Sequence, residues 1–401
     1  MSTKHICLPC ASAAQYREYV DDPAQYRQYL SEMLRQYPEL FPHGMDQGFT
    51  FHDAYASVKQ DVIVPRMKVK TTGAVFTLRP SFVMPYMIGH TDEVEKALYL
   101  RQWGVPCDAL ASVFGRDAMF WYRAWLAFGR PSLVGTTVKD PHKVPRDLVA
   151  DEKLTRVAKQ LVYVPTTVSD GCFLGVSVVE AADTVTLERG YGEFAKEVKA
   201  LDPTYHARSV CTDGWEATRQ AWRQLFPKIT LVLCFLHSIL KMQKHCAGPL
   251  RHQVLDKAWQ VYQAATKRQF TQRLRRVAEW TPVHLSGPVA AMVLKMCRRR
   301  ADFTPAYDCP QAHRTSHAVD RLMNSQDRLL YRGRYGHGTI DSARLAVRAM
   351  ALPWNFHPYG ARLRRDQPSR VSPFHDLNGF QYHPNWLHNL FIASSMGGLR
   401  H

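Results

Sequence analysis

The segment that decides the fold spans residues 208–237 and reads RSVCTDGWEATRQAWRQLFPKITLVLCFLH. Its first run, Ser209 to Thr212, is short, largely apolar and bounded, as expected for a buried strand. From Trp215 onward apolar residues recur at three- and four-residue steps, which predicts an amphipathic helix that ends at Pro227. A second apolar run over 229–235 predicts another strand. Strand, helix and strand in this order indicate an α/β core.

Asp213 directly follows the first of these strands and is the first candidate functional residue. An acidic side chain at the carboxyl end of a core strand is placed to bind a metal ion or a ligand. The alternative is that Asp213 caps the following helix, because aspartate is a favoured N-cap residue. Taken alone, the segment leaves both roles open.

The distribution of charge along the chain points to a polyanionic partner. The chain has 401 residues, enough for two or three domains, and a formal net charge of +17. Residues 241–308 carry +9 and residues 309–401 carry +7, which leaves +1 for residues 1–240. Such asymmetry favours nucleic acid or an anionic membrane as the partner.

The sequence also indicates where the protein works. No run of about eighteen apolar residues occurs, so we expect no membrane-spanning helix. The first residues lack the charged and apolar regions of a signal peptide, and nine scattered cysteines do not suggest a disulfide framework. We therefore expect a cytoplasmic, nucleoid-associated protein that binds DNA and no membrane.

Residues 1–90 form an N-terminal region with few functional signals. Cys7 and Cys10 make a single CxxC motif, with His5 before it. A zinc ribbon would need a second pair at similar spacing, and none follows nearby, so zinc binding stays open. Residues 62–78 alternate apolar and polar side chains around Thr72-Gly73, which predicts a β-hairpin.

Residues 91–135 are expected to form a helix-turn-helix region of three short helices. A short helix, a glycine turn at Gly115 and another short helix are typical of this motif, whose last helix enters a major groove. An ordinary helical hairpin has the same pattern, but the basic second half of the chain favours DNA binding. Arg116 and Arg123 are then candidate DNA-binding residues.

Residues 145–237 predict the first part of an α/β core with a mixed sheet. Three strands joined by short turns form an antiparallel meander, and a crossover helix then leads to the strand that ends at Asp213. The expected ranges are 148–152, 161–168 and 172–179 for the strands and 184–201 for the helix. Meander, helix, strand, helix and strand is the order of a ribonuclease H-like core.

Residues 238–308 predict a basic α-helical insertion into this core, which resumes over 309–355. Its basic residues are interleaved with aromatic ones, so the former can contact phosphates while rings stack on exposed bases. For any single aromatic residue, burial inside the helical body is the simpler explanation. The candidates for DNA contact are Trp259, Arg298, Arg299 and Arg300. Residues 356–401 read as a packed C-terminal extension with little functional signal.

Four motifs in order resemble the DDE/D transposases of bacterial insertion sequences, within the retroviral-integrase superfamily. They are Asp151 in Ala-Asp-Glu, Asp213 in Thr-Asp-Gly, Cys234-Phe-Leu-His237, and Asp320 in Thr-Ser-His-Ala-Val-Asp. Related transposases, including Mutator-like ones, carry a helical insertion between the second and third acids, as here. Asp320 departs from the glutamate that is usual at the third position.

The resemblance implies an enzyme of DNA recombination that cuts a phosphodiester and joins the freed 3′-hydroxyl to target DNA. Asp151, Asp213 and Asp320 would be catalytic and would bind two Mg²⁺ (or Mn²⁺) ions, which assist the attacking and leaving oxygens. Cys234 and His237 would be structural residues near the site. Trp259 would stack on an unpaired base, as a tryptophan does in comparable insertions.

The same resemblance implies double-stranded DNA partners, namely element ends and target DNA, and a homo-oligomer on that DNA. Two alternatives remain: a transposase-derived DNA-binding regulator without catalysis, and a ribonuclease H-like nuclease without strand transfer. Glu152 is a possible substitute for Asp151, although strand alternation would point it to the other face of the sheet.

Overall fold

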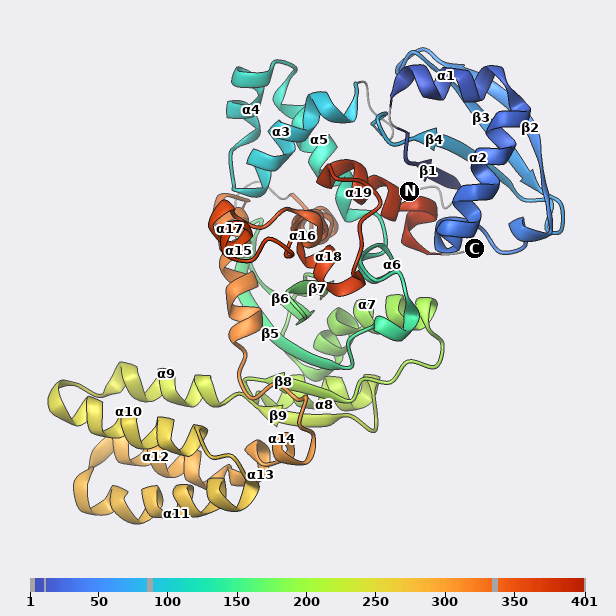
Figure 1. The fold of residues 1–401 in the computed structure, drawn as a ribbon. Coiled ribbons are helices and arrows are strands. Elements are labelled where there is room, and N and C mark those ends of the chain that lie inside the picture. Colours follow the sequence, from blue (N-terminus) through green and yellow to red (C-terminus); the bar gives the residue numbers. More distant parts are fainter. Residues whose placement is uncertain (1–3, 11, 85–88, 334–337, 400–401) are drawn as a thin grey trace.

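The computed structural model describes residues 4–10, 12–84, 89–333 and 338–399. They form an α/β protein with two mixed sheets and many helices. Figure 1 shows an N-terminal sheet region, a central core built on the second sheet, and a helical lobe that projects from that core.

The central sheet has five strands in the order β7-β6-β5-β8-β9 (Figure 1). The first three in sequence, β5 (Asp147–Val157), β6 (Gln160–Ser169) and β7 (Cys172–Val176), form the expected antiparallel meander. Strands β8 (Ser209–Thr212) and β9 (Thr230–Leu233) then run parallel to β5. The expected last strand is shorter than its apolar run, because Phe235 begins a helix instead.

Two crossover helices cover one face of this sheet. Helix α7 (Thr184–Leu201) leads from β7 to β8, and α8 (Glu216–Leu225) leads from β8 to β9. Their aromatic side chains pack with the sheet around Trp222, which is fully buried and contacts the rings of Tyr191 and Phe194. The apolar residues that recur periodically in the sequence therefore lie on the side of α8 that faces this core.

Helices α15 (His317–Gly333) and α16 (Ile340–Phe356) lie on the other face, as contacts of α15 with β5 and β6 and of α16 with β7 show. A buried hydrogen bond from Gln326 Nε2 to Thr166 Oγ1 (3.2 Å) joins α15 to β6. Because side chains alternate along a strand, Asp151 and Val149 point to this face and Glu152 to the face of α7 and α8.

The N-terminal sheet has the order β1-β4-β3-β2. Its strands are β1 (His5–Leu8), β2 (Phe49–Ser57), β3 (Val62–Val69) and β4 (Val75–Pro80), with helices α1 (Ala13–Asp21) and α2 (Pro23–Gln36) alongside. The expected hairpin around Thr72-Gly73 joins β3 to β4. The sequence did not predict β1, which pairs in parallel with β4 and so depends on residues about seventy positions away.

The three helices expected after this sheet are α3 (Thr91–Gln102), α4 (Cys107–Phe114) and α5 (Ala118–Leu126). Gly115 between the last two has a φ of 71°, a left-handed conformation that glycine adopts without strain. The side chain of Asp117 caps α5 by accepting a hydrogen bond from the Phe120 amide (2.7 Å). This turn fixes the angle between α4 and α5.

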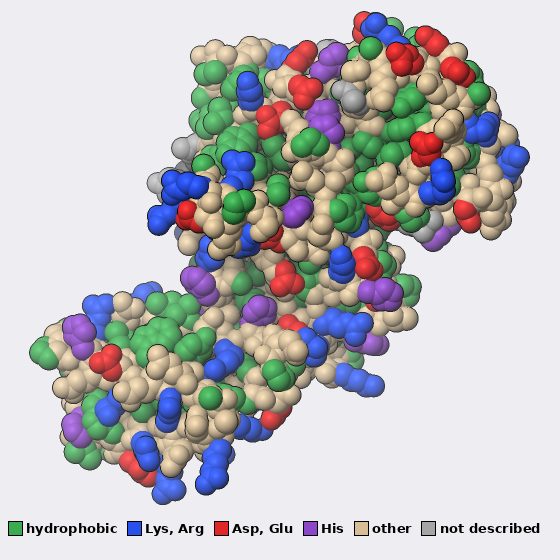
Figure 2. All heavy atoms as spheres, viewed as in Figure 1, with side chains coloured by type: hydrophobic (Ala, Val, Ile, Leu, Met, Phe, Trp, Pro, Cys, Tyr) green, Lys and Arg blue, Asp and Glu red, His purple; other side chains and the backbone are tan. Residues whose placement is uncertain are grey.

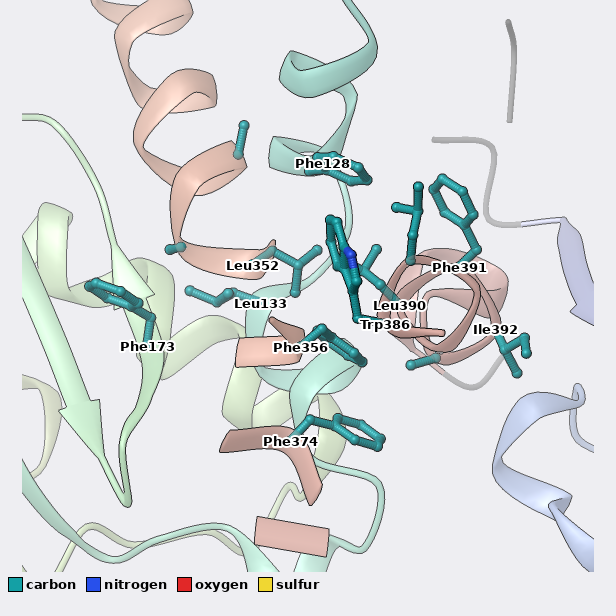
Figure 3. Close-up of a cluster of buried hydrophobic side chains, with 14 of the residues drawn as sticks. Phe128, Leu133, Phe173, Leu352, Phe356, Phe374, Trp386, Leu390, Phe391 and Ile392 are labelled. Atoms are coloured by element: carbon teal, nitrogen blue, oxygen red, sulfur yellow. The ribbon is translucent and has the colours of Figure 1, made fainter. Parts of the chain in front are cut away.

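The C-terminal extension is part of the main core. It contains α17 (Ala361–Asp366), α18 (Pro373–Asn378) and α19 (Trp386–Ala393), and it packs against α16 and the short helix α6 (Leu133–Thr137). Figure 3 shows Phe356 beside Phe374 in this cluster, with their rings stacked at 4.5 Å, and Phe128 is stacked on Phe391 at 6.0 Å. One continuous hydrophobic cluster thus joins the N-terminal sheet, α3 to α5, the central sheet and the extension.

The insertion is a separate helical lobe with its own apolar core (Figure 1). It comprises α9 (Phe235–His245), α10 (Gly248–Tyr262), α11 (Lys267–His284), α12 (Gly287–Arg298), α13 (Arg300–Phe303) and α14 (Pro305–Asp308). Leu233 and Phe235, at the end of β9, belong to that core, so the lobe is anchored beside the parallel strands. None of the helices that the structure describes is long and apolar enough to cross a membrane.

Candidate active site

Asp151 and Asp213 lie at corresponding positions on two adjacent parallel strands. The β5–β8 ladder ends with the pair Val149 and Cys211, and Asp151 and Asp213 each follow this pair by two positions, although β5 itself continues and pairs Asp151 with Thr166 of β6. Both carboxylates therefore leave the sheet at the edge where the parallel strands stop.

Asp213 does not cap the following helix. The N-cap residue of α8 is Trp215, whose amide donates a hydrogen bond to Asp213 Oδ1 (2.8 Å). This contact holds the carboxylate in a local turn ahead of the helix. The capping role that the sequence left open is thus excluded.

Asp320 comes to the same edge from the first turn of α15. Its Oδ2 atom accepts a hydrogen bond from Ser316 Oγ (3.1 Å). Ser316 is fully buried, and its amide donates in turn to Cys234 Sγ (3.0 Å), just beyond β9. Cys234 and Ser316 therefore connect the third acid to the end of the last parallel strand.

His237, in the first turn of α9, faces the first acid. Its Nε2 atom lies 3.7 Å from Asp151 Oδ2. A hydrogen bond with Cys234 raises the pKa of His237, and hydrogen bonds from Cys211 and His237 lower the pKa of the Cys234 thiol. The Cys-x-x-His motif thus places a cationic imidazole beside Asp151, in agreement with a structural role near the acids.

Burial and mutual repulsion both act on the carboxylates. Burial raises the pKa of Asp151 to about 6, and the negative charges of Asp213 and Asp320 act in the same direction, against His237. Burial also raises the pKa of Asp320. Asp213 and Asp320 therefore both lie within electrostatic range of Asp151, and a bound cation would relieve this repulsion.

These residues have the chemistry of a magnesium site, since carboxylate oxygens are the ligands that Mg²⁺ prefers. In the described ranges, no group of three or more His, Cys, Asp or Glu side chains is close enough to coordinate an ion as the chain stands. Asp151, Asp213 and Asp320 are the residues that would hold such an ion, and its positive charge would offset the repulsion at Asp151.

Glu152 lies on the opposite face of the sheet, as strand alternation predicts. Its Oε1 atom accepts hydrogen bonds from Tyr191 Oη (2.7 Å) and Thr218 Oγ1 (2.5 Å), beneath α7 and α8. Burial raises the pKa of Glu152 to about 7. It supports the first acid from behind and does not replace it.

Arg299, expected to contact DNA, instead contacts the loop that carries Asp213. Its Nη2 atom donates to Gly214 O (3.4 Å), and its Nε atom donates to Asp302 Oδ2 (2.9 Å). Asp302 also accepts from Arg219 on α8 (3.0 Å). Gly214 has a φ of 83°, and a Cβ there would lie 2.6 Å from Arg299 Nη2, so only glycine fits. The helical insertion is thus fastened to the acid loop.

The other candidates for DNA contact are exposed at the surface. Arg298 and Arg300 are exposed on the insertion, and Trp259 is 39% exposed, with its ring edge-on to Tyr262. Arg123 is exposed on α5. Arg116 lies 3.5 Å from Glu93 and over the Phe120 ring, so part of its charge is already compensated within the chain.

The cysteines of the single CxxC motif are held as neutral thiols. Burial raises the pKa of Cys7 and of Cys10 to about 12. A metal ligand has to be the thiolate, so this environment does not favour zinc. The possible site at Cys7 and Cys10 also finds no third ligand among the residues that the structure describes.

Sequence reasoning missed Ser316, Cys211 and the contact between Arg299 and Gly214. Ser316 was visible in the motif before Asp320, but its bond to Cys234 depends on tertiary structure. Comparison of the sequence with models of known protein families gave no match, and comparison with curated proteins gave none either.

Proposed function

We propose that the protein is a DDE/D-type DNA transposase that cuts DNA and transfers the freed strand. The observation that carries this proposal is the convergence of Asp151, Asp213 and Asp320 at one sheet edge from β5, the β8 loop and α15. Asp151 and Asp213 are 62 residues apart in the sequence, and Asp213 and Asp320 are 107 apart. Their convergence therefore reflects the fold and not local sequence.

The topology supports a ribonuclease H-like core. Three antiparallel strands are followed by two strands parallel to the first, in the order β7-β6-β5-β8-β9, with α7 and α8 as crossovers. The order of these elements along the chain is the one inferred from the sequence. The insertion interrupts it between β9 and α15. Function is argued from the acids, because a fold of this kind does not define a reaction by itself.

Each residue of the site then has a distinct role. The three aspartates would bind Mg²⁺ or Mn²⁺, which supplies activation of the attacking oxygen and stabilisation of the leaving oxygen when bound. Ser316 orients Asp320 through its hydroxyl, and His237 offsets the charge of Asp151. Arg299 and the Trp215 amide hold the loop that presents Asp213.

The DNA-binding regions would lie on either side of this site. We assign sequence recognition of element ends to α4 and α5, and backbone contacts to the exposed basic residues of the insertion, with Trp259 as a stacking residue. Figure 2 shows Lys and Arg side chains spread over the face of that lobe, consistent with a surface for phosphates. Action at two element ends would bring two copies of the chain together on DNA.

The test is to incubate the purified chain with gene-flanking DNA, target DNA and Mg²⁺, and to map nicks and joined products. We expect Mg²⁺-dependent nicks at the element ends and covalent joining to the target. Nicks without joining would support the nuclease alternative. Sequence-specific binding without any nick would support the regulator that has lost catalysis, and would overturn the proposal.

A further inference from the structure

A small cleft lies where the helix-turn-helix region, the core and the C-terminal extension meet. It encloses about 90 Å³ and is open to solvent, so it has room for part of one planar ring. Its walls come from the end of α3, from α15 and from the end of α16, and include Trp103, Ser325, Arg328, Trp354, His357 and Tyr359. None of these residues takes part in the site described above.

The cleft presents an exposed aromatic ring on a fixed base. Trp103 is 46% exposed, an unusual position for a large aromatic side chain. Its ring meets that of His357 edge to face at 5.7 Å, and His357 is stacked on Tyr99 at 4.2 Å. Because its neighbours are packed, Trp103 offers a ring face with little conformational freedom to lose on binding.

Positive charge lies near this ring. The guanidinium of Arg328 lies over Trp103, 5.4 Å from the ring centre. Helix α17, which follows the cleft residue Gly360, carries the exposed residues Arg362, Arg364 and Arg365, of which the first and last are paired with Asp366. Figure 2 shows basic side chains gathered at this edge of the main body. Arg364 is close enough to act electrostatically on His357.

His357 adds a buried polar atom that lacks a partner. Its Nδ1 atom lies 3.1 Å from Pro358 O, and because a carbonyl can only accept, Nδ1 carries the proton. Nε2 is then an acceptor, and it has no hydrogen-bond partner among the described residues. Burial lowers the pKa of His357 to about 4, so the ring stays neutral at physiological pH.

We propose that this cleft binds one unpaired nucleobase of a DNA strand, stacked on Trp103, with neighbouring phosphates on Arg328 and Arg364. An aromatic platform flanked by arginines is the common means of binding single-stranded nucleic acid. His357 would hold the Trp103 ring in place through its edge-to-face contact. The inference rests on the proposed function, because it assumes that the partner is DNA.

Helix α15 gives the position of that base relative to the acids. Arg328 follows Asp320 by eight residues, which is about 12 Å along a helix. A DNA strand advances about 3.4 Å per nucleotide. A strand that follows α15 would thus place the bound base about three or four nucleotides from the phosphate at Asp320. Arg321, at the start of this path, is also exposed.

The test compares the full-length chain and its variants for binding to a labelled thymidine strand and to the same strand made abasic, without metal. Trp103→Ala should weaken binding to the intact strand roughly tenfold and should leave the abasic strand nearly unchanged. Trp103→Phe should restore most of the loss, because it keeps a ring. Arg328→Gln and Arg364→Gln should weaken both strands alike, since phosphates are present in each.

Tyr55→Ala is the matched control, because Tyr55 is 45% exposed on β2, away from the basic surfaces. It should change neither affinity. If Trp103→Ala loses equal affinity for the intact and the abasic strand, or loses no affinity at all, the inference is overturned while the cleavage proposal stands. Failure of the wild-type chain to bind any DNA would overturn both.

Discussion

Two ion pairs, one in the α/β core and one in the helical insertion, have opposite environments. In the core, Glu197 is 12% exposed and Arg348 15%. In the insertion, the pair Arg275 and Glu279 is 81% and 60% exposed. Under the proposed function, only charges as exposed as the second pair reach the phosphates of DNA. Burial therefore separates charges that hold the fold from charges that are open to a partner.

The three consecutive arginines at the end of α12 show the same difference within one turn. Arg298 and Arg300 are exposed, whereas Arg299 is bonded to Asp302 and to the Gly214 carbonyl. A basic run in a sequence is thus not a single binding surface. Its middle member instead contacts the loop that carries Asp213.

The largest expected effect is on stability, from removing a buried charge. Glu197 accepts hydrogen bonds from Arg348 (2.6 Å), Ser132 Oγ (2.9 Å) and the Val134 amide (2.9 Å). Glu197→Ala would leave Arg348 unpaired, so we expect a loss of about 3–5 kcal/mol in the free energy of unfolding. Glu279→Ala, its exposed counterpart, should cost less than about 1 kcal/mol in the same urea titration. Equal losses would remove the distinction drawn between the two regions.

A smaller effect is expected on sequence recognition by α5. Arg123 is exposed, whereas Arg116 is shared with Glu93 and Phe120. Arg123→Ala should therefore reduce the preference for element-end DNA over scrambled DNA by about 1–3 kcal/mol if it contacts a base. Arg116→Ala should reduce it less. Competition binding with the full-length chain measures both, and an unchanged preference in Arg123→Ala would argue against α5 as the reading helix.

The smallest effect concerns the salt dependence of DNA affinity. Each phosphate contact contributes about −0.9 to the slope of log affinity against log salt. Arg298→Ala should flatten the slope by about that amount, and Arg299→Ala should leave it nearly unchanged. Replacing all three arginines should flatten the slope of log affinity against log salt by about 1.8, the value for two phosphate contacts, instead of about 2.7, the value for three. A loss near the larger value would mean that Arg299 releases its protein partners to bind DNA.

Local pattern was enough to predict the central sheet, its crossover helices and the three helices at 91–126. Apolar runs, Gly turns and helical periodicity are local signals, and here the tertiary structure agrees with them. Strand β1 and the roles of Arg299 and Ser316 were not predictable, because each depends on a partner far along the chain. The C-terminal extension carried no functional signal for the same reason. The proposed role of Arg364 depends on its position near His357 in the folded chain.

The roles of the three acids were inferred from their motifs, and the structure brings them to one edge of the sheet. The central claim of the proposed function is that Asp213 binds metal for catalysis. The Trp215 amide holds its carboxylate in a turn, and Asp213 is not used as a helix cap.

Asp213→Asn tests this most directly, because it removes one negative charge without changing the shape of the side chain. The variant should bind element-end DNA like the wild-type chain and should retain its melting temperature, while Mg²⁺-dependent strand cleavage falls below detection in a gel assay. Asp341→Asn, at an exposed position in the first turn of α16, is the control and should cleave normally. Cleavage by Asp213→Asn at the wild-type rate would contradict the proposed active site.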